Sequence, residues 1–117
     1  MAGGGDCLFC GIAAKKIPAA IVLETDKSIA FRDIHPKAPV HVLVIPKLHI
    51  DNLLALEPRE ADTLMDIHMT IQKVAREEGV AESGFRVAVN TGKDSGQAVG
   101  HLHYHVLAGR KLSWPPG

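Results

Sequence analysis

The stretch Val99-Gly100-His101-Leu102-His103-Tyr104-His105-Val106-Leu107 alternates histidines with apolar residues near the end of a chain of 117 residues. This alternation is typical of a half-buried strand, in which residues i, i+2 and i+4 share one face. We therefore expect His101, His103 and His105 on one side of a strand, with the apolar residues between them packed behind. Three rings on such a face span about 13 Å, too far for one metal ion. We expect the three histidines to have separate roles.

A histidine presented in this way can act as a nucleophile toward phosphorus. Neutral imidazole is a good nucleophile near pH 7 when one ring nitrogen is held as a hydrogen-bond donor, and a neighbouring histidine can protonate a leaving group. A metal site, or surface histidines without a role, are the alternatives that a short motif leaves open.

Length and composition fit one domain over residues 1–117, with a flexible start at 1–5 and a C-terminal tail at 109–117. Lys and Arg number 13, as do Asp and Glu, which argues against nucleic acid as a partner. No apolar run approaches the roughly 18 residues that span a membrane, and the start has no signal-peptide pattern. We therefore expect a cytoplasmic protein with no membrane partner.

The flanking sequence predicts an α+β domain with a five-stranded antiparallel sheet, one long helix and one short helix. A long apolar stripe at three- and four-residue spacing, with Pro58 before it and Gly79 after it, predicts the long helix. The expected helices cover 7–16 and 58–78, and the expected strands cover 20–24, 28–33, 40–45, 85–90 and 99–107.

Two further features carry weaker signals. The glycine-bearing loop 90–97 allows backbone N–H groups to approach an anion, although such loops are usually only turns. Cys7 and Cys10 form a single C-x-x-C, which supplies two of the four ligands of a structural zinc. No strand precedes the pair, which disfavours a thioredoxin-like redox site, whereas an idle pair of buried thiols stays open.

The segment His101–Leu107 resembles the H-φ-H-φ-H-φ-φ signature of the histidine triad (HIT) family. The resemblance extends over nearly the whole chain and is specific to the Hint branch in Phe31–Ile34, His41–Lys47, Gly96-Gln97 and the Trp-Pro-Pro-Gly ending at 114–117. It implies a HIT-like fold in which the sheets of two protomers join across a homodimer.

The resemblance implies a purine nucleoside phosphoramidase, which hydrolyses AMP joined to an amine or to lysine through a nucleotidyl-histidine intermediate. His103 would attack the α-phosphorus while its other ring nitrogen donates to the carbonyl of His101. His105 would contact the phosphate and the leaving group, and His41 would support the catalytic ring. The chemistry would require no cofactor, and the partners would be purine nucleotides such as AMP, GMP and their phosphoramidates.

The resemblance also implies a nucleotide pocket, with Asp33 on the ribose hydroxyls. The base would lie on apolar side chains, the phosphate would lie against the loop before the triad, and a residue of the tail would reach toward the partner's site. The implied residues are Leu8, Phe9, Ile12, Phe31, Ile34 and Leu43 for the base, Asn90, Gly96, Gln97, Ala98 and Val99 for the phosphate, and Trp114 in the tail.

Many bacterial relatives that begin with C-x-x-C carry a zinc, so the resemblance implies one structural zinc here, with Cys7, Cys10, His49 and His101 as its ligands. Ala98 departs from the pattern, because Hint proteins often have a hydroxyl there, which bears on turnover and on the leaving group.

Three alternatives to the phosphoramidase function stay open: dinucleoside polyphosphate hydrolysis, a catalytically weak nucleotide-binding interaction module, and a zinc protein whose histidines all bind metal.

Overall fold

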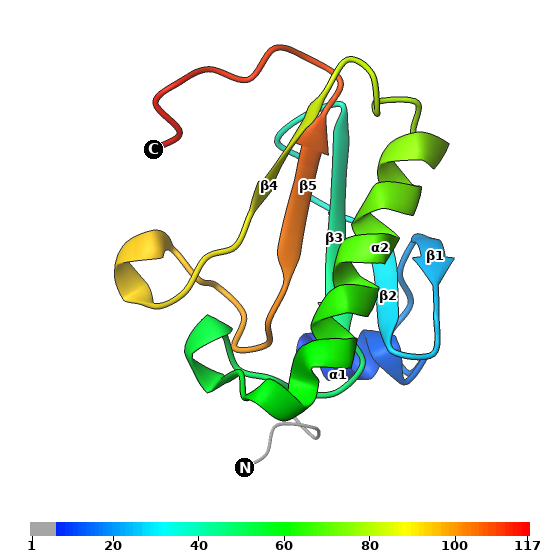
Figure 1. The fold of residues 1–117 in the computed structure, drawn as a ribbon, viewed down its shortest axis with the longest axis vertical. Helices are drawn as coiled ribbons and strands as arrows, with labels where there is room; N and C mark the ends of the chain where they lie inside the picture. Colours follow the sequence, from blue (N-terminus) through cyan, green and yellow to red (C-terminus); the bar gives the residue numbers. More distant parts are fainter. Residues whose placement is uncertain (1–6) are drawn as a thin grey trace.

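The computed structural model describes residues 7–117, so the expected flexible start at 1–5 lies outside the described residues. Five strands form one antiparallel sheet in the order β1-β2-β3-β5-β4, with one long and one short helix, as predicted (Figure 1). The helices are α1 (Leu8–Ala13) and α2 (Ala61–Glu77), and the strands are β1 (Ile21–Glu24), β2 (Ser28–Arg32), β3 (Val40–Pro46), β4 (Phe85–Ala88) and β5 (Tyr104–Ala108).

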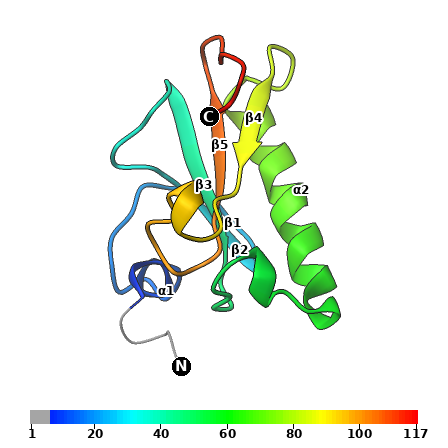
Figure 2. The same ribbon diagram turned by 90° about the vertical axis from the view of Figure 1, so that its left-hand side faces the viewer.

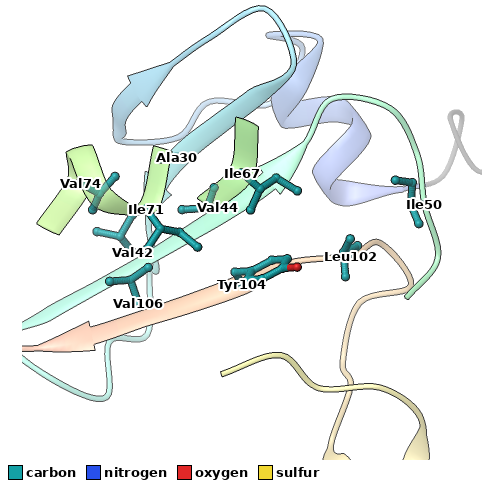
Figure 3. Close-up of a cluster of buried hydrophobic side chains, with 10 residues drawn as sticks. All are labelled: Ala30, Val42, Val44, Ile50, Ile67, Ile71, Val74, Leu102, Tyr104 and Val106. Carbon is teal, nitrogen blue, oxygen red and sulfur yellow. The ribbon is translucent and has the colours of Figure 1, made fainter. Parts of the chain in front are cut away.

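The two helices cover opposite faces of the sheet (Figure 2). One face packs against α2 through a cluster of fully buried side chains that includes Val42, Ile67 and Val106 (Figure 3). The other face packs Leu43 of β3 against Phe9 of α1. Alternate residues of β3 thus enter different cores, as the period of a strand requires. Each large side chain buried in this way contributes about 1.5–3 kcal/mol to stability.

The long helix begins three residues later than predicted. Residues Pro58–Glu60 form a 3-10 turn, in which the side chains of Glu57 and Glu60 each accept from the other residue's backbone N–H. This capping box satisfies N–H groups that the first turn leaves without partners. After Glu77 the chain turns at Gly79, whose φ of +74° suits a residue without a side chain.

The histidine strand is shorter than predicted, because β5 begins at Tyr104 rather than at residue 99. Before Tyr104 the chain leaves the sheet and bonds to the segment that follows β3, with Leu102 N–H donating to the carbonyl of Ile50. The alternation of side chains nevertheless continues, since Leu102 lies in the same core as Tyr104 and Val106. The period was therefore read correctly, whereas the extent of backbone pairing was not.

Smaller differences affect other element ends. The short helix stops at Ala13 instead of residue 16, and Lys15 adopts a φ of +64° that no helix continues through. The strand predicted for 85–90 ends at Ala88, and β2 ends at Arg32 rather than at residue 33. β3 extends one residue beyond the predicted end at 45, because Pro46 still pairs with Ser28. Among the described residues, no helix is both long enough and apolar enough to cross a membrane.

Candidate active site and metal centre

His103 has a fixed tautomer. Its ring is buried, and Nδ1 lies 2.7 Å from the backbone carbonyl of His101. A carbonyl only accepts, so Nδ1 carries the proton and donates it. Nε2 consequently keeps its lone pair, which is the state that a nucleophilic imidazole requires. The edge of Phe9 packs on this ring with a centroid distance of 5.1 Å.

A second hydrogen-bond chain sets the tautomer of His105. The backbone N–H of Lys37 donates to Nδ1 of His41 over 3.0 Å, so the proton of neutral His41 resides on Nε2. His41 Nε2 lies 2.9 Å from Nδ1 of His105 and donates to it. His105 therefore carries its own proton on Nε2. The rings of His103 and His105 lie 5.0 Å apart, so a lone pair and an N–H donor stand side by side.

Burial disfavours the charged forms of His41 and His105. It lowers the pKa of His105 from 6.5 to about 4, with the neighbouring rings of His103 and His41 adding to the effect. Burial is also the largest cause of the lowered pKa of His41, which the carboxylate of Asp33 opposes. At pH 7 His105 is thus a neutral hydrogen-bond donor and not the ready proton donor that the sequence pattern favoured.

A pocket of about 380 Å³ opens beside these rings, a size that accommodates a small ligand. Phe31 and Phe9 meet edge to face at 5.5 Å within its apolar wall. Asp33 lies at its polar end, where its carboxylate accepts from the backbone N–H of His35 and lies 3.4 Å from Nε2 of His41. The pocket thus combines an apolar slot with a carboxylate and two oriented imidazoles.

The structure brings eleven of the expected nucleotide-contacting residues together around this pocket. They are Leu8, Phe9, Ile12, Phe31, Asp33, Ile34, Leu43, Ala98, Val99, His103 and His105. Asn90, Gly96, Gln97 and Trp114 do not line it. Trp114 is 77% exposed, and the guanidinium of Arg86 lies over its ring at 5.6 Å from the centroid.

The sequence reasoning missed part of the wall. The residues concerned are Ile17, Pro18, Ala19, Arg32 and His35. The first three form the connection between α1 and β1, which has no periodic pattern, and only Pro18 indicates that the chain turns there. His35 reaches the wall because its backbone N–H donates to the carboxylate of Asp33, which turns the chain there. The sequence shows the two residues of this turn but not that it borders a pocket.

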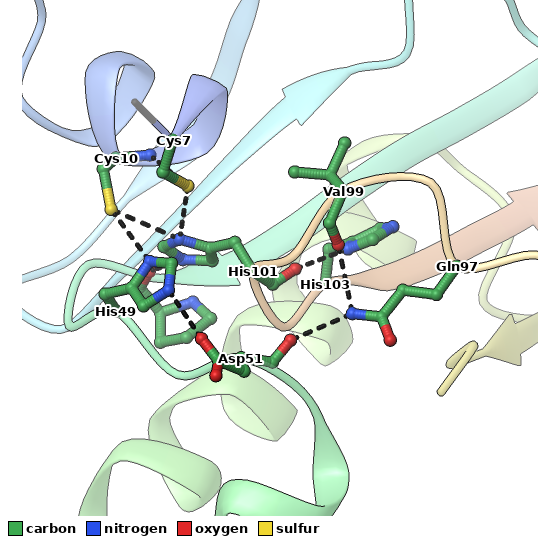
Figure 4. A network of polar contacts seen from close by, with 9 residues as sticks. Cys7, Cys10, His49, Asp51, Gln97, Val99, His101 and His103 are labelled. Carbon is green, nitrogen blue, oxygen red and sulfur yellow. Dashed lines mark hydrogen bonds and ion pairs between the residues drawn. The ribbon is translucent and has the colours of Figure 1, made fainter. Parts of the chain in front are cut away.

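A second cluster gathers Cys7, Cys10, His49 and His101, whose ligand atoms all lie within 4.8 Å of one another. Cys7 Sγ lies 3.2 Å from Nδ1 of His101, and Cys10 Sγ lies 3.1 Å from Nδ1 of His49 (Figure 4). Two sulfurs and two imidazoles from α1, the segment after β3 and the segment before β5 thus face one point.

This donor set fits a tetrahedral zinc ion. The outer nitrogen of each histidine is held by an acceptor: His49 Nε2 by Asp51 at 2.8 Å, and His101 Nε2 by the carbonyl of Pro46 at 2.9 Å. Both Nδ1 atoms therefore present lone pairs to the centre, the usual arrangement behind metal-binding histidines. Burial and the neighbouring Cys7 raise the pKa of Cys10 to about 11, so a cation at this point would be needed to stabilise a thiolate.

Asp33, His41 and His105 also lie within 4.8 Å of one another. The Lys37 N–H, however, places the His41 proton on the nitrogen that faces this group, where a metal would need a lone pair. The hydrogen-bonded arrangement explains this cluster better than a metal does.

Comparison with known proteins agrees with this geometry. A model of the HIT domain matches residues 14–112. A 14 kDa zinc-binding protein of Brassica juncea is 44% identical over 114 residues, which cover 96% of this chain and 100% of the relative. The adenylylsulfatase HINT1 of Arabidopsis thaliana is 45% identical over 112 residues, 94% of this chain and 76% of that protein. The crystal structure of a HIT family hydrolase from Legionella pneumophila superposes with a TM-score of 0.93 at 44% identity, covering 96% of this chain and 100% of that one. The chain therefore belongs to the HIT family.

Proposed function

We propose that this protein is a hydrolase of purine nucleoside 5′-phosphoramidates and that His103 acts as its covalent nucleophile. The observation that carries the proposal is the bond from His103 Nδ1 to the carbonyl of His101, which leaves Nε2 with a free lone pair beside a nucleotide-sized pocket. The names of the relatives from Arabidopsis and Legionella, an adenylylsulfatase and a hydrolase, support the reaction class.

The reaction has two displacements at phosphorus. In the first, the lone pair of His103 Nε2 forms a bond to the α-phosphorus, and the P–N bond to the amine breaks with its electron pair remaining on the amine nitrogen. Bound phosphate raises the pKa of the adjacent His105, which allows that ring to supply the proton that the amine takes up. In the second, water attacks phosphorus and gives a proton back to His105, the bond to His103 breaks with its electron pair returning to Nε2, and AMP is released. One water is consumed per turnover.

The pocket suits a nucleoside monophosphate. The base would lie against Phe9, Phe31 and Leu43, and Asp33 would accept hydrogen bonds from the ribose hydroxyls. The α-phosphate would then lie between His103 and His105 and beside the backbone of Ala98 and Val99. Asn90 and Gly96 do not line the pocket. Their contact with the phosphate stays a prediction, because they belong to the loop that leads to Ala98 and Val99.

One zinc ion would be held by Cys7, Cys10, His49 and His101, in agreement with the name of the Brassica relative. All four positions would be filled by protein donors, so such an ion stabilises the fold and does not contact substrate. His101 would join the two sites, because its ring belongs to the metal cluster and its carbonyl orients His103.

A homodimer would form through β4, the edge strand next to β5. Phe85 and Val87 on that strand are 37% and 39% exposed. An unpaired apolar edge is a template for another strand, and a second copy of β4 would cover it. Trp114, which is exposed in the single chain, would then be available to reach the partner's pocket.

Substitution of the nucleophile tests the proposal. His103→Ala is expected to lower hydrolysis of an adenosine phosphoramidate at least about a thousandfold, because no other group would form the covalent intermediate. Gln72→Ala, at an exposed position of α2, is the control and should keep wild-type rates. Undiminished hydrolysis by His103→Ala would exclude the mechanism.

The same preparation distinguishes the alternatives. Faster cleavage of a dinucleoside polyphosphate than of the phosphoramidate would indicate a polyphosphate hydrolase with the same histidine chemistry. Tight binding of AMP with no turnover of any phosphoramidate would indicate a binding module, to which the missing hydroxyl at Ala98 would contribute.

A further inference from the structure

The last residue of β3 and the segment that follows it, residues 46–51, hold the chain that leads to His103. Residues 99–103 precede β5 and have no ladder partner on β3. They are bonded instead to this segment: Pro46 accepts from the ring of His101, and the carbonyl of Ile50 accepts from Leu102 N–H over 2.6 Å. The placement of the His103 ring therefore depends on the placement of residues 46–51.

Asp51, at the end of this segment, has two partners of different kinds (Figure 4). Its carboxylate accepts from Nε2 of His49, one of the four residues of the metal cluster, over 2.8 Å. Its backbone carbonyl accepts from the side-chain amide of Gln97 over 2.9 Å. One residue thus contacts both the metal cluster and the loop before the triad.

The carboxamide of Gln97 is fully engaged within the protein. Its amide nitrogen donates one N–H to Asp51 and the other to the carbonyl of Val99 at 3.1 Å, and its oxygen accepts from Gly92 N–H at 2.9 Å. An amide nitrogen has two protons, so Gln97 has no donor left for a phosphate. The expected phosphate contact of Gln97 is therefore replaced by a contact that closes loop 92–97 and anchors it to Asp51.

We infer that Asp51 and Gln97 form a clasp that couples metal binding to the position of loop 92–97 and of the segment that leads to His103. A cation on Nδ1 of His49 strengthens the donor on its other nitrogen, which fixes Asp51 and with it the anchor of Gln97. Asp51 and Gln97 are positioning residues, because neither touches the pocket. The consequence for catalysis rests on the proposed function, whereas the coupling itself does not.

Coupling must be reciprocal, which gives a sharp test on the nucleotide-free protein. Gln97→Glu keeps the shape of the side chain, removes both donors and touches no residue of the metal cluster. It is expected to weaken zinc binding about fivefold or more, measured by competition with a chelator. Ser95→Ala is the matched control, since it removes a bond to Gly92 within the same loop and leaves the clasp intact. Its zinc affinity should equal that of the wild type.

The reverse direction uses Asp51→Ala in the zinc-loaded protein. Loss of the partner of His49 should weaken zinc binding at least about tenfold and, through the clasp, raise amide exchange of residues 92–97 about tenfold by NMR. Asn52→Ala is the control, because the one side-chain hydrogen bond of Asn52 among residues 7–117 is the one it accepts from Leu54 N–H, which lies outside the clasp. Wild-type zinc affinity in Gln97→Glu, or unchanged loop exchange in Asp51→Ala despite weakened zinc binding, would overturn the inference. Neither readout involves catalysis, so a failed His103 test leaves these results interpretable.

Discussion

At the scale of single residues, the site is defined by which nitrogen of each histidine carries a proton. Backbone groups make that choice: the carbonyl of His101 for His103, the N–H of Lys37 for His41 and the carbonyl of Pro46 for His101. These partners differ in kind, donor in one case and acceptor in two. Three histidines of similar chemistry thereby differ in state: His103 has a free lone pair on Nε2, His41 donates to His105, and His101 directs the lone pair of Nδ1 toward the Cys–His cluster.

The lowered pKa of His105 predicts acid sensitivity of the fold. Below its ordinary pKa of 6.5 the unfolded chain binds a proton that the folded chain does not bind until about pH 4. The free energy of unfolding should therefore be at its full value above pH 6.5 and fall as the pH is lowered from 6.5 to 4. His105→Asn should reduce this slope by up to about one proton, measured by urea unfolding at several pH values.

Gln72→Asn, which alters an exposed residue of α2 and neither adds nor removes a titratable group, is the control for this series and should retain the wild-type slope. An equally steep loss of stability in His105→Asn would show that His105 is not the group responsible.

The residue roles that could be predicted are those that follow from periodicity. A period of two separates His101, His103 and His105 from the core residues between them, whatever the backbone pairing. The family resemblance implied the tautomer of His103, and its contact with the carbonyl of His101 is present. The tautomers of His41 and His101 could not be predicted, because they depend on backbone groups at 37 and 46, which only the tertiary fold brings close.

At the scale of elements, the strands and the long helix were predictable because each buries a stripe at its own period. The residues at which these elements begin and end were harder to predict. β5 begins only at Tyr104, because the residues before it bond to residues 46–51 instead of pairing with β3. No local sequence pattern predicts this competition between hydrogen bonds. The part of the pocket wall that lies between α1 and β1 could not be predicted either, because an irregular segment has no hydrophobic period.

The end of β5 provides a test at this scale. Gly109 has a φ of +92°, and a Cβ added there would lie 2.8 Å from Cβ of Pro39. Gly109→Ala should therefore lower the free energy of unfolding by about 1–3 kcal/mol through backbone strain and overlap. Gly100→Ala, where an added Cβ meets nothing within 4 Å, should change stability by less than about 0.5 kcal/mol. Equal stability of the two variants in denaturant unfolding would refute the strain argument.

At the scale of the whole molecule, the sheet places the two sites on the face away from α2. The face toward α2 is filled by core side chains. On the other face, α1 supplies Phe9 to the pocket and Cys10 to the metal cluster, and Cys7 precedes its first residue. A metal-bound α1 would therefore also hold one wall of the nucleotide pocket.

The exposed edge of β4 predicts the oligomeric state. Val87→Lys should shift the protein toward monomer in sedimentation velocity, because a charge would be buried at the joined edge. Ile21→Lys on β1, the opposite edge, is the matched control, since Ile21 is 43% exposed. A dimer that survives Val87→Lys, or that Ile21→Lys disrupts equally, would place the interface elsewhere.

The central claim is that one imidazole with a free lone pair attacks phosphorus, and trapping its product tests this most directly. The protein would be mixed with a labelled adenosine phosphoramidate, quenched under denaturing alkaline conditions and mapped by peptide mass spectrometry. The account predicts one adenylyl group on His103 and none in His103→Ala. An adenylyl group on His101 or His105, or rapid hydrolysis with no adduct on any residue, would contradict it.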